Sequence, residues 1–397
     1  MNDADSPTPE TETGGAAGTM SPATLQAEIE AGNRVTILDV RTREDFETWR
    51  VAGEQVAVTN TPYYEFLEAE TAAVEAAPTG DPVVVVCAEG DASEYVADLL
   101  VAAGRTAVSL EDGMEGWARR YEATPVSGYD GSGTLLQYHR PATGCLSYLV
   151  VSAGEAAVID PLRAFVDRYR EDAAEYGADL VAAVDTHCHA DHVSGVGSLS
   201  EAGVTGYVPA ATVDRGMEIT ADLETVDHGE TIQIGDATIE VLHTPGHTTG
   251  MTSYRLEEQV LMTGDSLFVG TVARPDLEAD DEGAPAAARQ LYESLHERIL
   301  TLDGETIVAG GHAGTNDRPG PTGTYTARLE TLREEMDVLS LDEDAFVEYV
   351  LSNMPPRPAN YKQIIDANLG HVPVDDEEAF RIELGPNNCA ASQAAGD

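Results

Sequence analysis

Short apolar runs alternate with amphipathic stretches over the first third of the chain. The segment 81–86 ends in four valines, as expected of a strand that is buried on both faces. In chain order the pattern predicts a helix at 21–32 that begins at Ser21-Pro22, strand 35–40, a helical stretch with Phe46 and Trp49, strand 81–86, helix 93–103, strand 106–110 and helix 116–121. This alternation predicts an α/β domain built on a parallel sheet with helices on both faces.

From residue 133 onward the pattern changes to that of a mixed α/β domain. Two strands are predicted before the first helix, and apolar runs then recur at wider intervals. The expected strands are 146–151, 156–159, 180–184, 238–242, 253–255, 260–263 and 306–309, and one helix is expected to end near 176 and another to span 285–300. The sequence VSGYDGSG, which begins at Val126, has no apolar period and predicts a connection between two domains.

Composition sets the outer boundaries. Residues 1–19 are mostly Ser, Thr, Pro, Gly, Ala and acids, which bury too little apolar surface to offset the entropy of ordering the chain. We therefore expect a disordered acidic tail at 1–19, a first domain at 20–124, a linker at 125–132, a second domain at 133–371 and a C-terminal tail at 372–397.

The balance of charge excludes two classes of partner. The chain has 22 Lys and Arg against 71 Asp and Glu, a formal net charge of −49, and Lys362 is its single lysine. Nucleic acids and anionic membranes both require a positive face, so neither is an expected partner. An acid excess spread along the whole chain indicates a halophilic protein, because salt screens the self-repulsion of the carboxylates.

Hydropathy and cysteine usage indicate a soluble, cytoplasmic protein. No apolar stretch reaches the roughly eighteen residues that a membrane span requires, and the N-terminal segment is acidic, unlike a targeting signal. The sequence leaves a homo-oligomer open. The four cysteines are too few and too scattered for a disulfide framework, so we expect individual buried or reactive thiols at Cys87, Cys145, Cys188 and Cys389.

Histidine and aspartate side chains gather at the ends of four predicted strands. The strand at 180–184 is followed by His187, His189, Asp191 and His192, the strand at 238–242 by His247, the strand at 260–263 by Asp265, and the strand at 306–309 by His312. A single histidine in a loop is ordinarily solvated, but a set of this size at strand ends is not expected by chance. Because imidazole and carboxylate groups are ligands of zinc and iron, the sequence predicts a metal site.

The motif His-x-His-x-Asp-His at 187–192 resembles that of the metallo-β-lactamase superfamily, and the resemblance spans about residues 133–371. It implies an αββα sandwich for the second domain. His243-Thr-Pro-Gly-His247-Thr, together with Gly264-Asp265-Ser-Leu-Phe268, is similar to the branch that contains glyoxalase II and the persulfide dioxygenases.

These two kinds of enzyme imply different metal sites. The hydrolase resemblance implies two Zn²⁺ per chain, one on His187, His189 and His247 and the other on Asp191, His192 and His312, with Asp265 bridging them. A metal-bound hydroxide would then attack a thioester carbonyl. The dioxygenase resemblance implies one Fe²⁺ per chain on His187, His247 and Asp265, the two-His, one-carboxylate triad of iron(II) oxygenases. Its substrates would be a thiol persulfide and O2, and its products sulfite and thiol.

Three features favour the dioxygenase. The Cys188-His189-Ala190 filling of the motif is typical of that family, Arg274-Pro275-Asp276 follows Asp265 at the family's spacing, and the run from Met354 to Asn368 resembles the family's closing segment. Arg274 is therefore a candidate catalytic residue, with a structural salt bridge as the equal alternative.

Two family positions associated with glutathione differ in this chain. Gly314 stands where a Tyr is usual, and Thr326-Ala327-Arg328 stands where the family has Asn-Pro-Arg. The identity of the thiol carrier therefore stays open.

The first domain resembles a single rhodanese domain over residues 20–124. Leu38-Asp39-Val40-Arg41, Val86-Cys87 and the run from Asp112 to Trp117 carry the resemblance. It implies Cys87 as a catalytic thiol that carries persulfide sulfur within a ring of backbone N–H groups. The loop has Glu89 and Asp91 where arginines are usual, and negative charge disfavours a thiolate, so a non-catalytic domain is the alternative.

Taken as one chain, the sequence predicts a persulfide dioxygenase coupled to a rhodanese-like, sulfur-handling domain. The alternatives are a glyoxalase II-like thioester hydrolase with a dinuclear metal site and a non-enzymatic persulfide-binding module.

Overall fold

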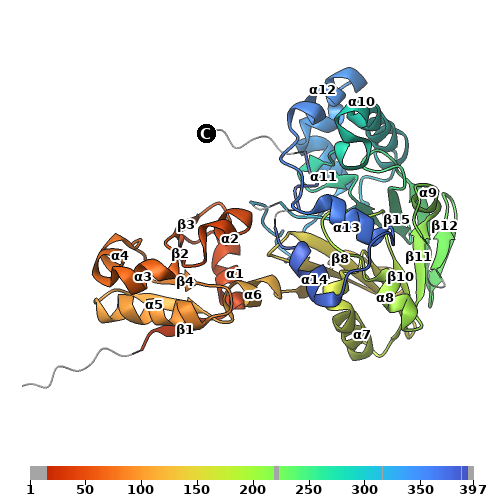
Figure 1. The fold of residues 1–397 in the computed structure, drawn as a ribbon. Coiled ribbons are helices and arrows are strands. Elements are labelled where there is room, and N and C mark those ends of the chain that lie inside the picture. Colours follow the sequence, from red (N-terminus) through yellow and green to blue (C-terminus); the bar gives the residue numbers. More distant parts are fainter. Residues whose placement is uncertain (1–15, 219–222, 315, 386, 392–397) are drawn as a thin grey trace, which may run out of the picture. The chain divides into compact units, whose positions relative to one another are not determined.

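The chain folds into two compact units. The computed structural model describes residues 16–218, 223–314, 316–385 and 387–391, and Figure 1 shows their elements. One unit extends to Arg120 and the other begins at Tyr121. Within the described residues, no helix combines the length and the apolar character that crossing a membrane would require.

The first unit is built on a parallel five-stranded sheet in the order β1-β5-β4-β2-β3. Its elements are β1 (Gly18–Met20), α1 (Pro22–Glu30), β2 (Val35–Asp39), α2 (Arg43–Thr48), β3 (Val56–Asn60), α3 (Tyr63–Glu68), α4 (Glu70–Ala76), β4 (Val83–Val86), α5 (Asp91–Ala102), β5 (Ala107–Leu110) and α6 (Gly113–Ala118). Val83 and Val85 pack against residues of α3, α4 and α5 on one face, and β4 is buried along its whole length, so the other face is covered as well. The predicted parallel sheet with helices on both faces is confirmed.

Two strands of this sheet were not predicted. β3 is a short edge strand whose residues are half-buried or exposed, and its apolar run is only three residues long, Val56 to Val58. β1 occupies the end of the segment that composition assigned to the tail, and its three residues pair with Val108 to Leu110 of β5. Backbone pairing, which composition does not report, orders both strands.

The second unit contains two large sheets. The seven-stranded sheet has the order β12-β11-β10-β9-β8-β7-β6, the six-stranded sheet the order β13-β14-β15-β16-β19-β20, and β17 and β18 form a separate ribbon. The strands are β6 (Glu122–Pro125), β7 (Thr134–Arg140), β8 (Cys145–Ser152), β9 (Glu155–Ile159), β10 (Asp179–Val184), β11 (Thr205–Pro209), β12 (Leu223–Val226), β13 (Thr231–Ile234), β14 (Ala237–His243), β15 (Thr252–Leu256), β16 (Val260–Gly264), β17 (Leu267–Phe268), β18 (Thr271–Val272), β19 (Ile307–Gly310) and β20 (Thr326–Arg328). The helices are α7 (Val166–Glu175), α8 (Val196–Glu201), α9 (Ala210–Asp214), α10 (Asp276–Ser294), α11 (Leu329–Glu335), α12 (Glu343–Ser352), α13 (Tyr361–Asn368) and α14 (Asp376–Ile382).

Alternating side chains divide the core of this unit into layers. Tyr148 and Val150 of β8 face the six-stranded sheet, whereas Leu149 and Val151 belong to the cluster that packs on α7 and α8. A third cluster lies between the outer face of the six-stranded sheet and α10, α11 and α12. Helix, sheet, sheet and helix layers therefore stack in the predicted αββα sandwich.

The observed segment boundaries differ from the expected ones at two places. β6 lies before residue 126, yet its backbone pairs with β7, so the second unit begins at Tyr121. Residues 376–382, expected in a tail, form α14, whose Ala379 and Ile382 are buried with Val193 and Ile364. The segment is mostly polar in sequence. It is nevertheless ordered, because its few apolar side chains pack against the domain.

A buried ion pair fixes the end of α14. An Arg140 Nη atom lies 2.6 Å from Oε2 of Glu383, both side chains are fully buried, and the Val193 amide donates to the other Glu383 oxygen at 3.0 Å. We expect Arg140→Met to leave the Glu383 carboxylate unpaired and to lower local stability by about 3–5 kcal/mol. Amide hydrogen exchange at Val193 measures that loss.

The matched control is Arg140→Met combined with Glu383→Leu, which removes both charges and should recover most of the protection. Unchanged exchange at Val193 in the single variant would contradict this account of the C-terminal segment.

Candidate metal centre

The predicted metal ligands converge from loops that follow four strands. His187 follows β10, His247 follows β14, Asp265 follows β16 directly, and His312 follows β19. Gly264, at φ +47°, permits the turn into Asp265, since a Cβ there would lie 2.6 Å from Thr186 Oγ1. The fold thus brings side chains that are far apart in sequence to one place.

His187, His247 and Asp265 form one compact group. Their ligand atoms all lie within 4.8 Å of one another, and the Oδ2 atom of Asp265 is 3.9 Å from Nε2 of His187 and 3.5 Å from Nε2 of His247. Both Nε2 atoms and both carboxylate oxygens are buried without a hydrogen-bond partner among the described residues. Unpaired buried polar atoms are costly, so their convergence fits a bound cation.

The opposite ring nitrogens are fixed by hydrogen bonds. His247 Nδ1 donates to the main-chain oxygen of Arg274 at 2.7 Å. Thr186 Oγ1 donates to Asp160 Oδ2 at 3.0 Å and so accepts from His187 Nδ1 at 2.8 Å. These contacts select the tautomer in which each Nε2 presents its lone pair to a metal. Burial and neighbouring imidazoles lower the pKa of His187 well below its usual value, in keeping with a neutral ligand.

His189 belongs to a different group. Its Nε2 lies 3.1 Å from Asp160 Oδ1 and 3.7 Å from Asp185 Oδ1, and these three residues form a buried cluster of their own. Burial opposes protonation of His189, but the two carboxylates outweigh it and raise the pKa of the ring well above its usual value. The two carboxylates therefore favour the protonated form of the His189 ring.

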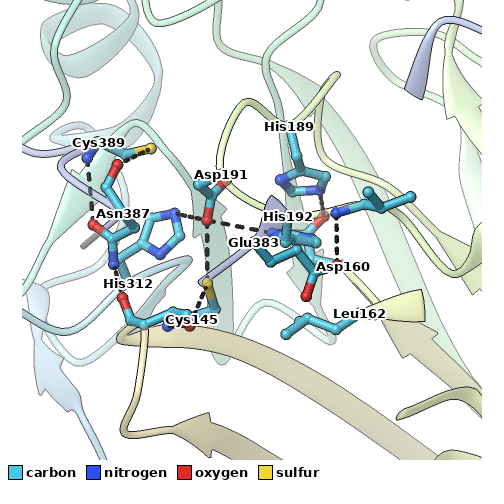
Figure 2. A network of polar contacts seen from close by, with 12 residues as sticks. Cys145, Asp160, Leu162, His189, Asp191, His192, His312, Glu383, Asn387 and Cys389 are labelled. Carbon is cyan, nitrogen blue, oxygen red and sulfur yellow. Dashed lines mark hydrogen bonds and ion pairs between the residues drawn. The ribbon is translucent and has the colours of Figure 1, made fainter. Parts of the chain in front are cut away.

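Asp191 lies between His192 and His312, as Figure 2 shows, and His312 also approaches the triad. His312 Nε2 is 3.2 Å from Asp265 Oδ1 and 3.5 Å from Asp191 Oδ2, and His192 Nδ1 is 3.3 Å from that same Asp191 oxygen. His312 thus faces the carboxylate oxygen of Asp265 that points away from His187 and His247.

Known protein families match both units of the chain. The family model described as Metallo-beta-lactamase superfamily matches residues 140–312, and the Rhodanese-like domain model matches residues 21–120. The human protein named "Persulfide dioxygenase ETHE1, mitochondrial" is 30% identical over 247 residues, which are 60% of this chain and 90% of the human one. The chain belongs to the ETHE1 persulfide dioxygenase family.

Solved structures resemble the second unit of this family member. The crystal structure of ETHE1 from Myxococcus xanthus is 28% identical with a TM-score of 0.50, over 59% of this chain and 96% of that one. A metallo-beta-lactamase from Staphylococcus aureus is 26% identical with a TM-score of 0.55, over 60% of this chain and 74% of that one. The family's metallo-β-lactamase fold implies that the protein binds a metal.

Arg274 lies in a buried ion pair. Its Nε and Nη2 atoms are 2.7 and 3.0 Å from the Asp276 carboxylate, and Nη1 donates to the main-chain oxygens of Pro356 and Asn388 at 3.0 Å each. All three guanidinium nitrogens thus have protein acceptors. Its backbone oxygen accepts from His247, so the contacts support a positioning role rather than contact with a substrate.

Cys87 lies in the first unit, in the loop between β4 and α5. Its buried Sγ atom accepts a hydrogen bond from the Gly90 amide at 3.0 Å and lies 3.3 Å from Ser93 Oγ. The amides of Met114 and Glu115, at the start of α6, donate to the main-chain oxygens of Cys87 and Ala88. Among the described residues, one backbone N–H reaches the sulfur, and not the ring of N–H groups that the rhodanese resemblance implies.

One group near the triad was not predicted. Asp160, left-handed at φ +53°, holds both Thr186 and His189. It is not adjacent in sequence to the motif that it contacts, so no local signal marks it. Cys145, expected to be a buried or reactive thiol, is buried and lies 3.1 Å from Asp191 Oδ2.

Thr186 offers a direct test of the hydrogen bonds behind the triad. Thr186→Val keeps the shape of the side chain but leaves His187 Nδ1 and Asp160 Oδ2 without their shared hydroxyl. We expect metal affinity to fall about 10- to 100-fold, as measured by competition with a chelator. Thr186→Ser retains the hydroxyl and should retain the affinity. Equal affinities for the Val and Ser variants would show that the hydroxyl has no part in holding the metal.

Proposed function

We propose that the second unit is an iron(II) dioxygenase that oxidises a low-molecular-weight thiol persulfide with O2 to sulfite and thiol, with one Fe²⁺ per chain. The observation that supports this most is the separate group of His187, His247 and Asp265, two imidazoles and one carboxylate with buried, unpaired ligand atoms. Three protein ligands leave positions open on an iron(II) ion. When bound there, iron supplies the redox chemistry by which O2 oxidises the outer sulfur of the persulfide.

The alternative, a dinuclear thioester hydrolase, requires more of the neighbouring residues. In that reading His189 would join the first metal, but its ring is shared between Asp160 and Asp185. This contact favours a single ion on the triad.

The protein's own residues hold and shield the reacting centre. His187 and His247 are oriented from behind by Thr186 and by the Arg274 carbonyl, and all three triad side chains are buried. Burial excludes bulk water, which would otherwise compete for open coordination positions. Overall, one persulfide, one O2 and one water give one thiol and one sulfite.

The first unit is proposed to handle persulfide sulfur through Cys87. The reaction partners are then small molecules, and no role is assigned to nucleic acid or membrane. A cytoplasmic location, based on hydropathy and cysteine usage, and adaptation to high salt, based on the acidic composition, are part of the same proposal.

The iron assignment is tested on protein purified without oxygen. We expect one iron per chain and consumption of O2 when a thiol persulfide is added, and we expect Asp265→Ala to reduce both to background because the triad loses its carboxylate. Elemental analysis and an oxygen electrode measure the two quantities. Two zinc ions per chain, together with rapid thioester hydrolysis, would instead identify the protein as a dinuclear hydrolase. If the Asp265→Ala protein still carried out the protein's role in the cell, the protein would be a persulfide-binding module.

A second test separates the two units. Cys87→Ser is expected to abolish sulfur transfer from thiosulfate, because it removes the accepting sulfur, and to leave O2 uptake with free persulfide unchanged. Assays of sulfite and thiocyanate, with thiosulfate as sulfur donor and cyanide as acceptor, measure sulfur transfer, and the oxygen electrode measures O2 uptake. Cys188→Ser, at another buried thiol, is the control for sulfur transfer. Thiosulfate activity that survives in Cys87→Ser would make the first unit a non-catalytic domain.

A further inference from the structure

A cysteine of the C-terminal segment lies against the metal centre. Cys389 is fully buried, and its sulfur lies within 4.8 Å of a ring nitrogen of His312 and a carboxylate oxygen of Asp191. His312 in turn places its Nε2 atom 3.2 Å from Oδ1 of the triad residue Asp265. Figure 2 shows Cys389 beside His312. The sulfur is therefore separated from the carboxylate of the triad by a single side chain.

The imidazole next to this sulfur has no hydrogen bond of its own. Both ring nitrogens of His312 are buried without a hydrogen-bond partner among the described residues, and only 4% of the side chain is exposed. The Cys389 thiol itself makes one long contact, donating to the main-chain oxygen of Asn387 at 3.4 Å. Buried polar atoms without partners are costly, so this place suits a further polar atom carried on the Cys389 sulfur.

Arg274 holds Cys389 and the triad together. Its amide donates to the main-chain oxygen of Cys389 at 3.0 Å, and its Nη1 atom donates to that of Asn388 at 3.0 Å. The main-chain oxygen of Arg274 accepts from Nδ1 of the triad residue His247 at 2.7 Å. Asn388 and Ala390, on either side of Cys389, are only half-buried, so the segment lies at the surface of its unit with the thiol turned inward. The position of the sulfur is thus fixed relative to a metal ligand.

We propose that Cys389 is a sulfur-carrying residue: it takes the outer sulfur from a low-molecular-weight persulfide, and the resulting Cys389 persulfide is the species that O2 oxidises. This inference rests on the proposed dioxygenase function and names its immediate substrate. The sequence leaves the thiol carrier open, and a thiol of the protein itself would fill that role at the metal centre.

The transfer step is a thiol exchange without net oxidation. The Cys389 sulfur bonds to the outer sulfur of the donor R–S–SH, the S–S bond of the donor breaks, and R–S⁻ leaves. Burial and the carboxylates of Asp191 and Asp265 raise the pKa of Cys389 well above its usual value. The sulfur therefore enters the exchange as a thiol, and its proton leaves with the donor as R–SH.

The oxidation step returns the free thiol. One Cys389 persulfide, one O2 and one water give one Cys389 thiol and one sulfurous acid, which ionises to sulfite. Four electrons pass from sulfur to O2, and the S–S bond on Cys389 breaks. The two steps add up to the overall reaction of the proposed function. Burial of the sulfur protects the persulfide from bulk water and from other thiols.

The test loads the full-length protein, with its resident metal, with cysteine persulfide in the absence of oxygen. The outer sulfur of the donor is isotopically labelled, and a Cys87→Ser protein is used because it lacks the thiol proposed to carry sulfur in the first unit. After gel filtration removes the free donor, alkylation and peptide mass spectrometry locate the label. We expect one labelled sulfur per chain, on Cys389, and its conversion to one labelled sulfite per chain when O2 is admitted.

A matched pair of variants accompanies this experiment. Cys389→Ser keeps a donor towards the Asn387 oxygen, so the resident metal and the unfolding temperature should be unchanged. The label, the single turnover and steady O2 uptake with free persulfide should fall to background. Cys145→Ser, at another buried thiol near Asp191, should keep the label on Cys389.

The outcomes separate this inference from the function on which it rests. Normal O2 uptake by Cys389→Ser, a label that is absent from Cys389, or a label there that O2 does not convert to sulfite would each overturn the inference and leave the dioxygenase intact. No O2 uptake by the unsubstituted protein would overturn the proposed function, and the inference with it. Because the label is located on native Cys389, the result does not depend on how well the Cys389→Ser variant folds.

Discussion

The contact on which the metal centre most depends is the one between Asp160 and the loop after β10. Asp160 ends β9 in a left-handed conformation, and its Oδ1 atom accepts from the Thr186 amide at 2.7 Å and faces His189 at 3.1 Å. Its other oxygen accepts from the Thr186 hydroxyl, which in turn orients His187. The buried Asp160 carboxylate, just after the parallel neighbour of β10, thus fixes the tautomer of His187. It also holds His189 outside the triad.

The sandwich makes this arrangement possible. β10 lies within the seven-stranded sheet, while β14, β16 and β19 belong to the six-stranded sheet. Because the apolar faces of the two sheets pack against each other, the loops that follow these strands meet at one edge. The C-terminal segment then reaches the same place, where Asn368 donates to the main-chain oxygens of His189 and His192, and Glu383 accepts from Val193.

Asp191 separates two kinds of donor chemistry within this edge. On one side are the imidazoles and carboxylate of the triad, which contain no sulfur. On the other side is the Cys145 thiol, 3.1 Å from Asp191.

Local sequence determined the elements with strong periodicity and marked the candidate metal ligands. The four valines of β4, the apolar strand before His187 and the histidines at strand ends are all visible without coordinates, because buried parallel strands and metal ligands leave local patterns. Edge strand β3 and the polar-looking α14 left no such pattern, because pairing and one-sided packing with distant residues order them. Only the tertiary structure decided how the seven candidate ligands divide: His189 goes to Asp160 and Asp185, and His312 faces Asp265. Each of those partners comes from another strand or loop, and the distance between them is set by how the two sheets pack.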